Sequence, residues 1–313
     1  MKRWLISLPI LGALLLVAAA PAFTPPGLSF APGSARVELP VPDLTDDVIA
    51  GAESRLTWHS GEQRTEWAIV SLHGFSASRQ ETAPLAEKIA AALYANLYEV
   101  RLSGHGLRQN ALHDVVAEDW LRDTEQAIAA GAALGNKVVL IGTSTGATLI
   151  ASMIGSETMR YVDTLVMLSP NFGVRDASAT WLTRPYGRLL AKAFAGDTRT
   201  WEPHNELQGR YWTTSYPTSA LIEVMRLVDR ANAGLPATID QRLLVFYSRD
   251  DQVVLPPAIV AAYDLIASPQ KALVEIRNPG DPSHHVLAGD ILSPGSTDSI
   301  TRSIVEFISR PAP

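Results

Sequence analysis

The chain has 313 residues, of which 47% are hydrophobic and 19% are charged, and its formal net charge is −6. These values are typical of a globular protein and exclude a disordered chain, and the acidic balance gives no electrostatic basis for binding nucleic acid. The absence of cysteine excludes disulfides, cysteine nucleophiles, cysteine-ligated metals and a lipid-modified cysteine anchor.

Residues 1–22 have the layout of an export signal. Lys2 and Arg3 precede an apolar run from Trp4 to Ala22, and small residues near the end of the run offer cleavage positions. The run is also long enough to span a bilayer, which takes about 17–25 residues. We therefore expect a cleaved signal peptide or an uncleaved membrane anchor. In either case the folded part is expected to be exported, and to be periplasmic, secreted or held at the membrane.

Residues 23–45 are rich in proline, which predicts an extended spacer rather than packed structure. The remainder, residues 46–313, is expected to be one folded domain. Within it, short apolar runs typical of buried strands alternate with longer patterns at helical spacing. We expect strands at 67–74, 96–102, 137–142, 161–169, 242–248 and 271–277, and helices at 82–95, 115–134, 145–154, 256–266 and 297–309. Apolar strands that alternate with helices predict an α/β fold with a mostly parallel sheet covered on both faces.

The alternation is interrupted between Asn171 and Pro236. This stretch is rich in tryptophan, tyrosine and arginine, and one helix is expected at 219–233. An insertion at this point lies over the carboxyl edge of the sheet, where open α/β sheets bind ligands. We therefore expect residues 172–236 to form an inserted lid. The alternative is that its aromatic residues form a small core of the insertion itself.

The segment Gly142-Thr143-Ser144-Thr145-Gly146 lies directly between a predicted strand and a predicted helix. The pattern G-x-S-x-G has a mechanical meaning in that context, because a sharp turn between strand and helix lifts the serine hydroxyl into a cleft. Glycine is needed where the neighbouring backbone leaves no room for a Cβ. Ser144 is therefore a candidate nucleophile, and the alternative is a helix start without catalysis.

A serine hydroxyl becomes a useful nucleophile only when a base takes its proton and an acid orients that base. Asp250 and Asp251 follow the strand predicted at 242–248, and His284 and His285 follow the last predicted strand. Both pairs therefore stand in the order serine, acid, histidine along the chain. The residues alone leave the choice within each pair open.

Five motifs resemble the α/β-hydrolase family, in particular its serine carboxylesterase and monoacylglycerol lipase-like (lysophospholipase-like) members. They are LHGF, RLSGHG, GTSTGA, RDDQVV and SHHV, and the resemblance covers roughly residues 67–309. It implies Asp251 rather than Asp250 as the acid, since the family's acid precedes an x-Val-Val or similar triplet. It implies His285 rather than His284 as the base, since the family's histidine precedes an aliphatic residue.

An acyl-transfer intermediate also needs two backbone N–H donors for its oxyanion. One is expected from Thr145, the residue after the nucleophile, and the resemblance implies Phe75 as the other. His73 stands before Gly74 and is expected to brace that loop rather than to transfer a proton. The resemblance implies that His105, in the SGHG motif, is likewise structural.

No metal-ligand spacing and no dinucleotide fingerprint is present, so we expect hydrolysis without a cofactor or metal. The expected function is hydrolysis of carboxylic esters through an acyl-enzyme, with small acyl esters or lipid esters such as monoacylglycerols as substrates. Two alternatives stay open: acyl transfer to another alcohol from the same site, and a non-catalytic binding protein on this fold. The sequence does not decide the oligomeric state.

Overall fold

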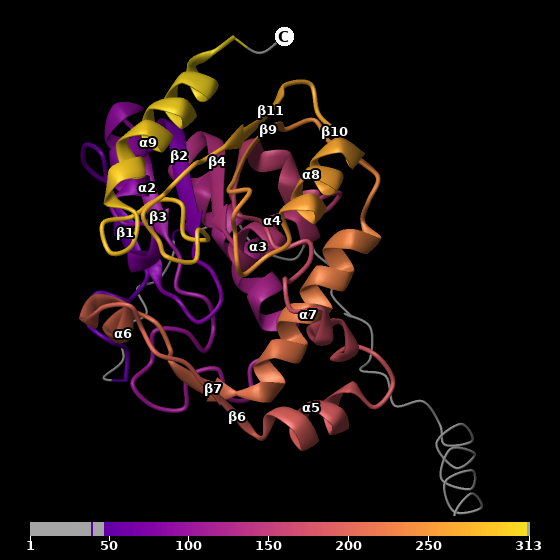
Figure 1. Cartoon of the computed structure of the whole chain (residues 1–313). Coiled ribbons are helices and arrows are strands. Elements are labelled where there is room, and N and C mark those ends of the chain that lie inside the picture. Colours follow the sequence, from indigo (N-terminus) through magenta and orange to yellow (C-terminus); the bar gives the residue numbers. More distant parts are fainter. Residues whose placement is uncertain (1–38, 40–46, 312–313) are drawn as a thin grey trace, which may run out of the picture.

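The computed structural model describes residue 39 and residues 47–311 (Figure 1). The predicted export segment at 1–22 lies outside the described residues, as does the proline-rich spacer apart from residue 39. Within the described part of the chain, no helix is long and apolar enough to cross a membrane.

A seven-stranded sheet forms the centre of the molecule (Figure 1). In spatial order its strands are β1 (Arg55–Thr57), β3 (Asn96–Glu99), β2 (Thr65–Leu72), β4 (Gly135–Thr143), β5 (Val162–Leu168), β9 (Arg242–Tyr247) and β11 (Lys271–Glu275). Only β1 runs antiparallel to its neighbour, and every other pair in the sheet is parallel. The predicted α/β fold is therefore confirmed, while β1 is an edge strand that the sequence pattern did not indicate.

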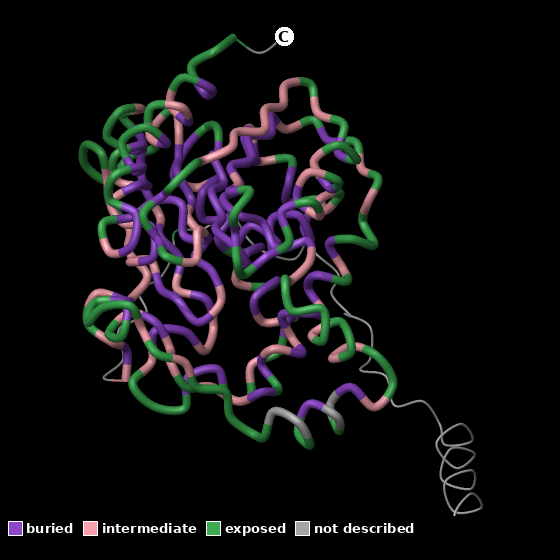
Figure 2. The backbone as a smooth tube through the Cα atoms, viewed as in Figure 1, coloured by how far each residue is buried: buried purple, intermediate pink, exposed green. Residues whose placement is uncertain are grey.

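The central strands are apolar throughout because helices cover both faces of the sheet. Leu140 of β4 lies in register with Val70 of β2 and Leu165 of β5, and all three side chains are fully buried. Side chains alternate between the two faces along a strand, so a continuous apolar run requires protein on both sides. Figure 2 shows the buried backbone gathered at this centre.

The covering helices are α2 (Leu85–Ala92), α3 (Ala117–Leu134), α4 (Thr145–Ser152), α7 (Thr218–Ala233), α8 (Pro256–Leu265) and α9 (Pro294–Ser309). Helices α2 and α9 share one core cluster on one face, around Ile69 and Phe246. Helices α3, α4, α7 and α8 share the cluster on the opposite face, around Val70 and Trp120. In Figure 1 these two sets lie on opposite sides of the sheet.

The minor elements are η1 (Arg79–Glu81), η2 (Glu157–Tyr161) and the pair β8 (Ala237–Thr238) and β10 (Ile266–Ala267).

The insertion between β5 and β9 is built from short elements and one long helix. They are η3 (Ala177–Trp181), α5 (Gly187–Ala195), β6 (Thr198–Thr200), α6 (Glu206–Tyr211), β7 (Ser215–Pro217) and α7. Helix α7 matches the one helix expected in this stretch, whereas the short elements were not predicted. In Figure 1 the elements α5, α6, β6 and β7 lie along the bottom of the view.

Contacts at three places attach the insertion to loops that follow the carboxyl ends of strands. The Thr213 N–H donates to the Ser76 carbonyl at 2.6 Å. Val174 pairs with Val254 in an isolated bridge, and the Asn205 side chain donates to the Ile291 carbonyl at 3.1 Å. The insertion therefore covers the expected edge of the sheet, and its action as a lid stays a prediction.

The aromatic side chains that the structure describes in the insertion do not form one common core. Trp212 is 7% exposed and packs with Ala77 and Val286, which lie in the loops after β2 and β11. Tyr216 meets the Phe75 ring edge-on, with the ring centres 5.0 Å apart. Trp181, by contrast, is 63% exposed. Some of these aromatic side chains therefore fix the insertion to the loops around the candidate site.

Replacing Phe246 by alanine is expected to lower the free energy of unfolding by about 3–5 kcal/mol, because its ring is fully buried in the cluster between the sheet, α2 and α9. Leu265, at the end of α8, is 48% exposed, and Leu265→Ala is expected to change stability by less than about 0.5 kcal/mol. Urea unfolding followed by circular dichroism measures both. Equal losses in the two variants would contradict this account of the core.

Candidate active site

Ser144 occupies a strained turn between β4 and α4. Its backbone has φ 51° and ψ −116°, and φ in this region is unfavourable for any residue with a Cβ. The Ser144 N–H donates to the Leu168 carbonyl at 2.8 Å, and the Ser144 carbonyl accepts from the Thr148 N–H at 3.0 Å. These two bonds join the turn to the end of β5 and to the first turn of α4, and so hold the strained conformation.

The two glycines of the G-x-S-x-G pattern are required by close backbone contacts. A Cβ on Gly142 would lie 2.6 Å from the Gly146 carbonyl carbon, and a Cβ on Gly146 would lie 2.4 Å from the Leu72 carbonyl oxygen. Both distances are far below a van der Waals contact. The turn packs so tightly, within itself and against the end of β2, that only glycine fits at these two positions of the pattern.

Asp251 and His285 form a buried hydrogen-bonded pair. His285 Nδ1 lies 2.8 Å from Asp251 Oδ2, and the aspartate is fully buried. The other oxygen, Asp251 Oδ1, accepts from the N–H groups of Val253 and Val254 at 2.8 and 2.9 Å. One oxygen thus holds the aspartate loop and the other orients the imidazole, which leaves Nε2 as the ring nitrogen available to take a proton.

The loop that carries His285 is held by bonds to its backbone. Asp281 Oδ2 accepts from the N–H groups of His285 and Val286, both at 2.9 Å. The Ser169 hydroxyl, directly after β5, donates to the His285 carbonyl at 2.7 Å. Burial alone would raise the pKa of Asp281, but the hydrogen bonds that it accepts outweigh burial and lower it. The side chain is therefore a charged anchor for this loop.

The other member of each pair is placed differently. Asp250 is exposed, and its N–H donates to the Ser248 hydroxyl at 3.3 Å. His284 has a positive φ of 57°, and within the described residues its buried Nδ1 has no hydrogen-bond partner. The geometry therefore brings together Asp251 and His285, the same pair that the resemblance implies. Their catalytic roles stay predictions.

The charged groups around His285 raise its pKa. Burial lowers the pKa, but the charge of Asp251 and the hydrogen bond to it, together with the charges of Glu81 and Asp281, outweigh burial. A base must be neutral to accept a proton, so this arrangement sets the acid limit of any reaction that uses His285 as the base.

The two predicted oxyanion donors lie on loops that meet at Ser144. A Cβ on Gly74 would lie 3.2 Å from the Ser144 Cβ, so the loop that carries Phe75 touches the elbow that carries Thr145. Among the residues that the structure describes, neither the Phe75 nor the Thr145 N–H has a hydrogen-bond acceptor. Two unpaired N–H groups beside a serine are what an oxyanion hole requires.

The two histidines predicted to be structural are buried and hydrogen-bonded to backbone. The Leu102 N–H donates to His73 Nε2 at 3.1 Å, so Nδ1 carries the proton and donates to the Gly74 carbonyl at 2.8 Å. Burial lowers the pKa of His73 to about 4, which keeps the ring neutral at physiological pH. His105 is fully buried with its Nδ1 3.1 Å from the Ser103 carbonyl. Both contacts agree with bracing roles.

No group of three or more histidine, aspartate or glutamate side chains in the described chain is placed to hold a metal ion. Hydrolysis without metal or cofactor stays a prediction.

Two buried acids beside the site were missed by the sequence reasoning, Asp281 in the His285 loop and Glu81. Glu81, the last residue of η1, is 3% exposed, and its Oε2 accepts the Gly74 N–H at 2.6 Å. It belongs to no pattern that marks a catalytic acid. The only signal is a glutamate shortly after the LHGF motif, which is also an ordinary position for a helix-capping residue.

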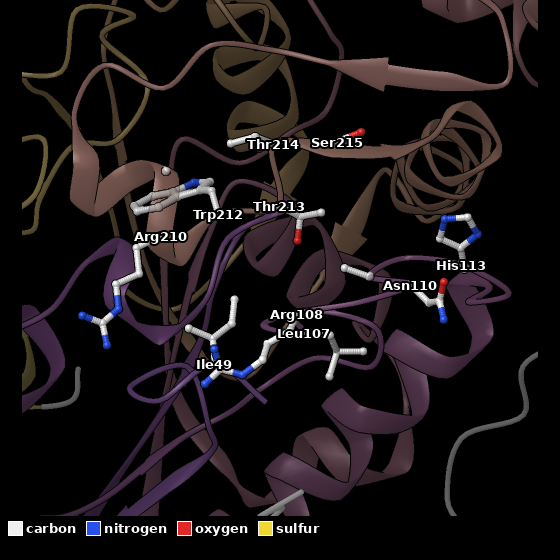
Figure 3. Close-up of a pocket in the computed structure, with 12 residues that line it drawn as sticks. Ile49, Leu107, Arg108, Asn110, His113, Arg210, Trp212, Thr213, Thr214 and Ser215 are labelled. Carbon is white, nitrogen blue, oxygen red and sulfur yellow. The ribbon is translucent and has the colours of Figure 1, made fainter. Parts of the chain in front are cut away.

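A polar cavity of about 430 Å³ lies between the insertion and the loop at 107–113. Figure 3 shows Thr213, Thr214 and Ser215 on one side and Ile49 and Arg108 facing them on the other. Because the Thr213 N–H binds the Ser76 carbonyl, one wall of this cavity adjoins the loop that carries Phe75.

Known proteins resemble this chain in sequence and in fold. Residues 69–290 match the model of the alpha/beta hydrolase family. The chain is 25% identical over 244 residues to a thermostable monoacylglycerol lipase of Bacillus sp. (strain H-257), a match that covers 78% of this chain and 91% of that protein.

Two solved structures show the same fold. One comes from work on LipS and LipT, two metagenome-derived lipolytic enzymes (TM-score 0.66, 21% identity, 84% of this chain and all of that one). The other is a monoacylglycerol lipase of Paleococcus ferrophilus (TM-score 0.59, 16% identity, 82% of this chain and 97% of that one). With most of its length matched by the family model, and with the sheet and elbow described above, the chain belongs to the alpha/beta hydrolase family.

Proposed function

We propose that this protein is a serine hydrolase that cleaves carboxylic esters through an acyl-enzyme intermediate. The observation that carries the proposal is the buried bond between Asp251 and His285, on the same edge of the sheet as the strained elbow at Ser144. An alpha/beta hydrolase with lipases and esterases among its relatives is consistent with ester hydrolysis.

In the proposed first half-reaction, the Ser144 hydroxyl oxygen attacks the ester carbonyl carbon while His285 Nε2 takes its proton. The N–H groups of Phe75 and Thr145 bind the oxyanion of the tetrahedral intermediate. The intermediate collapses, the bond to the alcohol breaks, and His285 returns the proton to the leaving oxygen. Asp251 keeps the imidazole in the required tautomer and favours its charged form.

In the second half-reaction, water attacks the acyl-enzyme and gives its proton to His285. The carboxylic acid leaves, and the proton returns to the Ser144 oxygen. An alcohol in the place of this water would give acyl transfer instead. Product analysis of the acyl-enzyme's breakdown, with glycerol or a short alcohol as competing acceptor, distinguishes the two outcomes.

We propose lipid or other acyl esters, such as monoacylglycerols, as the substrate class. The Bacillus relative is described as a monoacylglycerol lipase, which supports this class. The insertion also holds a cavity of about 340 Å³ with apolar side chains in its lining, among them Trp181, Leu182 and Leu221. Apolar surface of this kind is what an acyl chain needs from a binding site.

We also propose that the protein acts outside the cytoplasm, because Lys2, Arg3 and the apolar run that follows them have the layout of an export signal. Fractionation of cells that express the whole chain, with N-terminal sequencing of the recovered protein, distinguishes a cleaved signal peptide from an anchor.

Ser144→Ala is expected to reduce kcat/KM for p-nitrophenyl acyl esters by at least about 10³-fold, because the nucleophile is lost. Circular dichroism and Tm should stay near the wild-type values. A fluorophosphonate probe should label Ser144 of the wild type, as checked by mass spectrometry of the labelled peptide. Unchanged turnover in Ser144→Ala would refute the assignment.

The adjacent residues offer a matched test of the acid. Asp251→Asn is expected to lower kcat about 10³–10⁴-fold, since the imidazole loses the partner that fixes its tautomer. Asp250→Asn, which removes the same charge from an exposed side chain, is expected to stay within about threefold of the wild type. If Asp250→Asn lost far more activity than Asp251→Asn, Asp250 rather than Asp251 would be the acid that orients the base.

The pH dependence of kcat/KM tests the base. The pKa of His285 is raised above its usual value, and only the neutral ring accepts the Ser144 proton. Activity is therefore expected to be full at alkaline pH and to be lost as the pH falls through a value above 6.5. If kcat/KM, measured under rapid-equilibrium conditions, stayed constant from alkaline pH to below 6.5, that result would argue against His285 as the base.

A further inference from the structure

We propose that Glu81 is a positioning residue of this site: it orients the loop that carries the Phe75 N–H, and its carboxylate is a further counter-charge for the imidazole of His285. This inference rests on the proposed function, because it assigns Glu81 to the same reaction. Glu81 is not part of the predicted set of serine, acid, histidine and oxyanion donors. It is a buried acid that needs a physical explanation of its own.

The first observation is the place of the carboxylate. Its Oε2 accepts the Gly74 N–H at 2.6 Å. The point where a Gly74 Cβ would lie is 2.9 Å from Glu81 Oε1 and 3.2 Å from the Ser144 Cβ. The carboxylate and the elbow therefore flank the same glycine, and any side chain at Gly74 would push one of them away.

The second observation is that Gly74 is held on both sides. Glu81 accepts its N–H, and His73 Nδ1 donates to its carbonyl at 2.8 Å. The Gly74 carbonyl and the Phe75 N–H belong to one planar trans peptide unit, so they point in opposite directions. Fixing Gly74 at both ends therefore fixes the direction of the Phe75 N–H, at a residue type that would otherwise be free to turn.

The third observation is that Glu81 lies between the oxyanion loop and the loop that carries His285. A Cβ on Gly289 would lie 2.4 Å from the Glu81 carbonyl oxygen, so the backbones are in direct contact. The Asp290 N–H also donates to the Ala83 carbonyl at 2.9 Å, which joins the same two segments. Glu81 therefore contacts the donor loop through its carboxylate and the loop that carries His285 through its backbone.

The charges agree with this placement. Burial raises the pKa of Glu81 to about 7; the Gly74 N–H and the attraction of His285 oppose that rise, and Asp281 adds to it. The charged groups that act on His285 are Asp251, Glu81 and Asp281, and each of them raises its pKa. Glu81 and His285 therefore influence each other's titration.

Glutamine at position 81 separates the two roles. Glu81→Gln keeps an oxygen that can accept the Gly74 N–H but removes the negative charge. We expect the plateau kcat on p-nitrophenyl butyrate to stay within about fivefold of the wild type. The acid limb of kcat/KM should move to lower pH by roughly 0.5–1 unit, because the imidazolium loses a nearby counter-charge.

Alanine at position 81 removes the acceptor as well. Glu81→Ala is expected to lower kcat by about 10–100-fold and to leave KM within about threefold of the wild type. The reason is that a misdirected oxyanion donor reduces binding of the transition state more than binding of the substrate. If this variant is insoluble, Glu81→Asp replaces it, because its shorter side chain withdraws the carboxylate from the Gly74 N–H.

The matched control is Glu99→Gln. Glu99 is also buried with a pKa raised to about 7 by burial, but it pairs with Arg55 at the β1 edge of the sheet. This variant is expected to lower Tm and to leave the acid limb of kcat/KM in place. If Glu81 contributed to stability alone, Glu81→Gln would, like Glu99→Gln, lower Tm and leave the acid limb of kcat/KM in place.

A second readout does not depend on turnover. The imidazole ¹⁵N signals of the seven histidines are titrated in wild type, Glu81→Gln and Glu99→Gln, and His285 is assigned by its absence in His285→Gln. The pKa of His285 should fall in Glu81→Gln only. An unchanged His285 pKa overturns the charge role, and a wild-type kcat in Glu81→Ala overturns the orienting role. If the wild type hydrolyses no ester, the proposed function fails, while the titration still decides whether Glu81 acts on His285.

Discussion

The site depends on one close backbone contact, between the elbow after β4 and the end of β2. Gly146 approaches the Leu72 carbonyl so closely that even a methyl group would not fit. This contact brings the strained Ser144 against the loop that begins at His73, and the predicted oxyanion donors come from those two segments. Strain at a functional residue persists only where the surroundings hold it, and here the bond from Ser144 to the Leu168 carbonyl does so.

The parallel sheet supplies the rest of the arrangement. All strands but β1 end at the same edge, so Ser144, Asp251 and His285, which are far apart in the chain, follow β4, β9 and β11 at that one edge. The buried charges at this edge are distributed with distinct tasks. Asp251 orients the imidazole of His285, and Asp281 holds the backbone of the loop that carries His285. Glu81 holds Gly74, in the loop that carries Phe75. Removing any one leaves a buried partner without its counterpart, which is costly at low dielectric.

Prediction from the sequence succeeded where a signal was local and repeated. The long apolar strands and the helix α7 could be predicted, because their patterns extend over many residues. Strand β1 has three residues and pairs only at the edge, so it has no pattern long enough to recognise. The short elements of the insertion likewise depend on contacts such as that of Trp212 with Val286 rather than on their own periodicity.

The sequence by itself determined the fold class, the elbow around Ser144, and the order of serine, acid and histidine, because each depends on residue types at fixed local spacing. Only the tertiary structure decided that Asp251 rather than Asp250 meets an imidazole, and that this imidazole is His285. It also placed Glu81 against Gly74, a contact within the connection from β2 to α2 that no sequence pattern indicates. The physical reason is that which of two adjacent side chains points inward follows from hydrogen bonds to other segments, such as the one that the Ser169 hydroxyl donates to the His285 carbonyl.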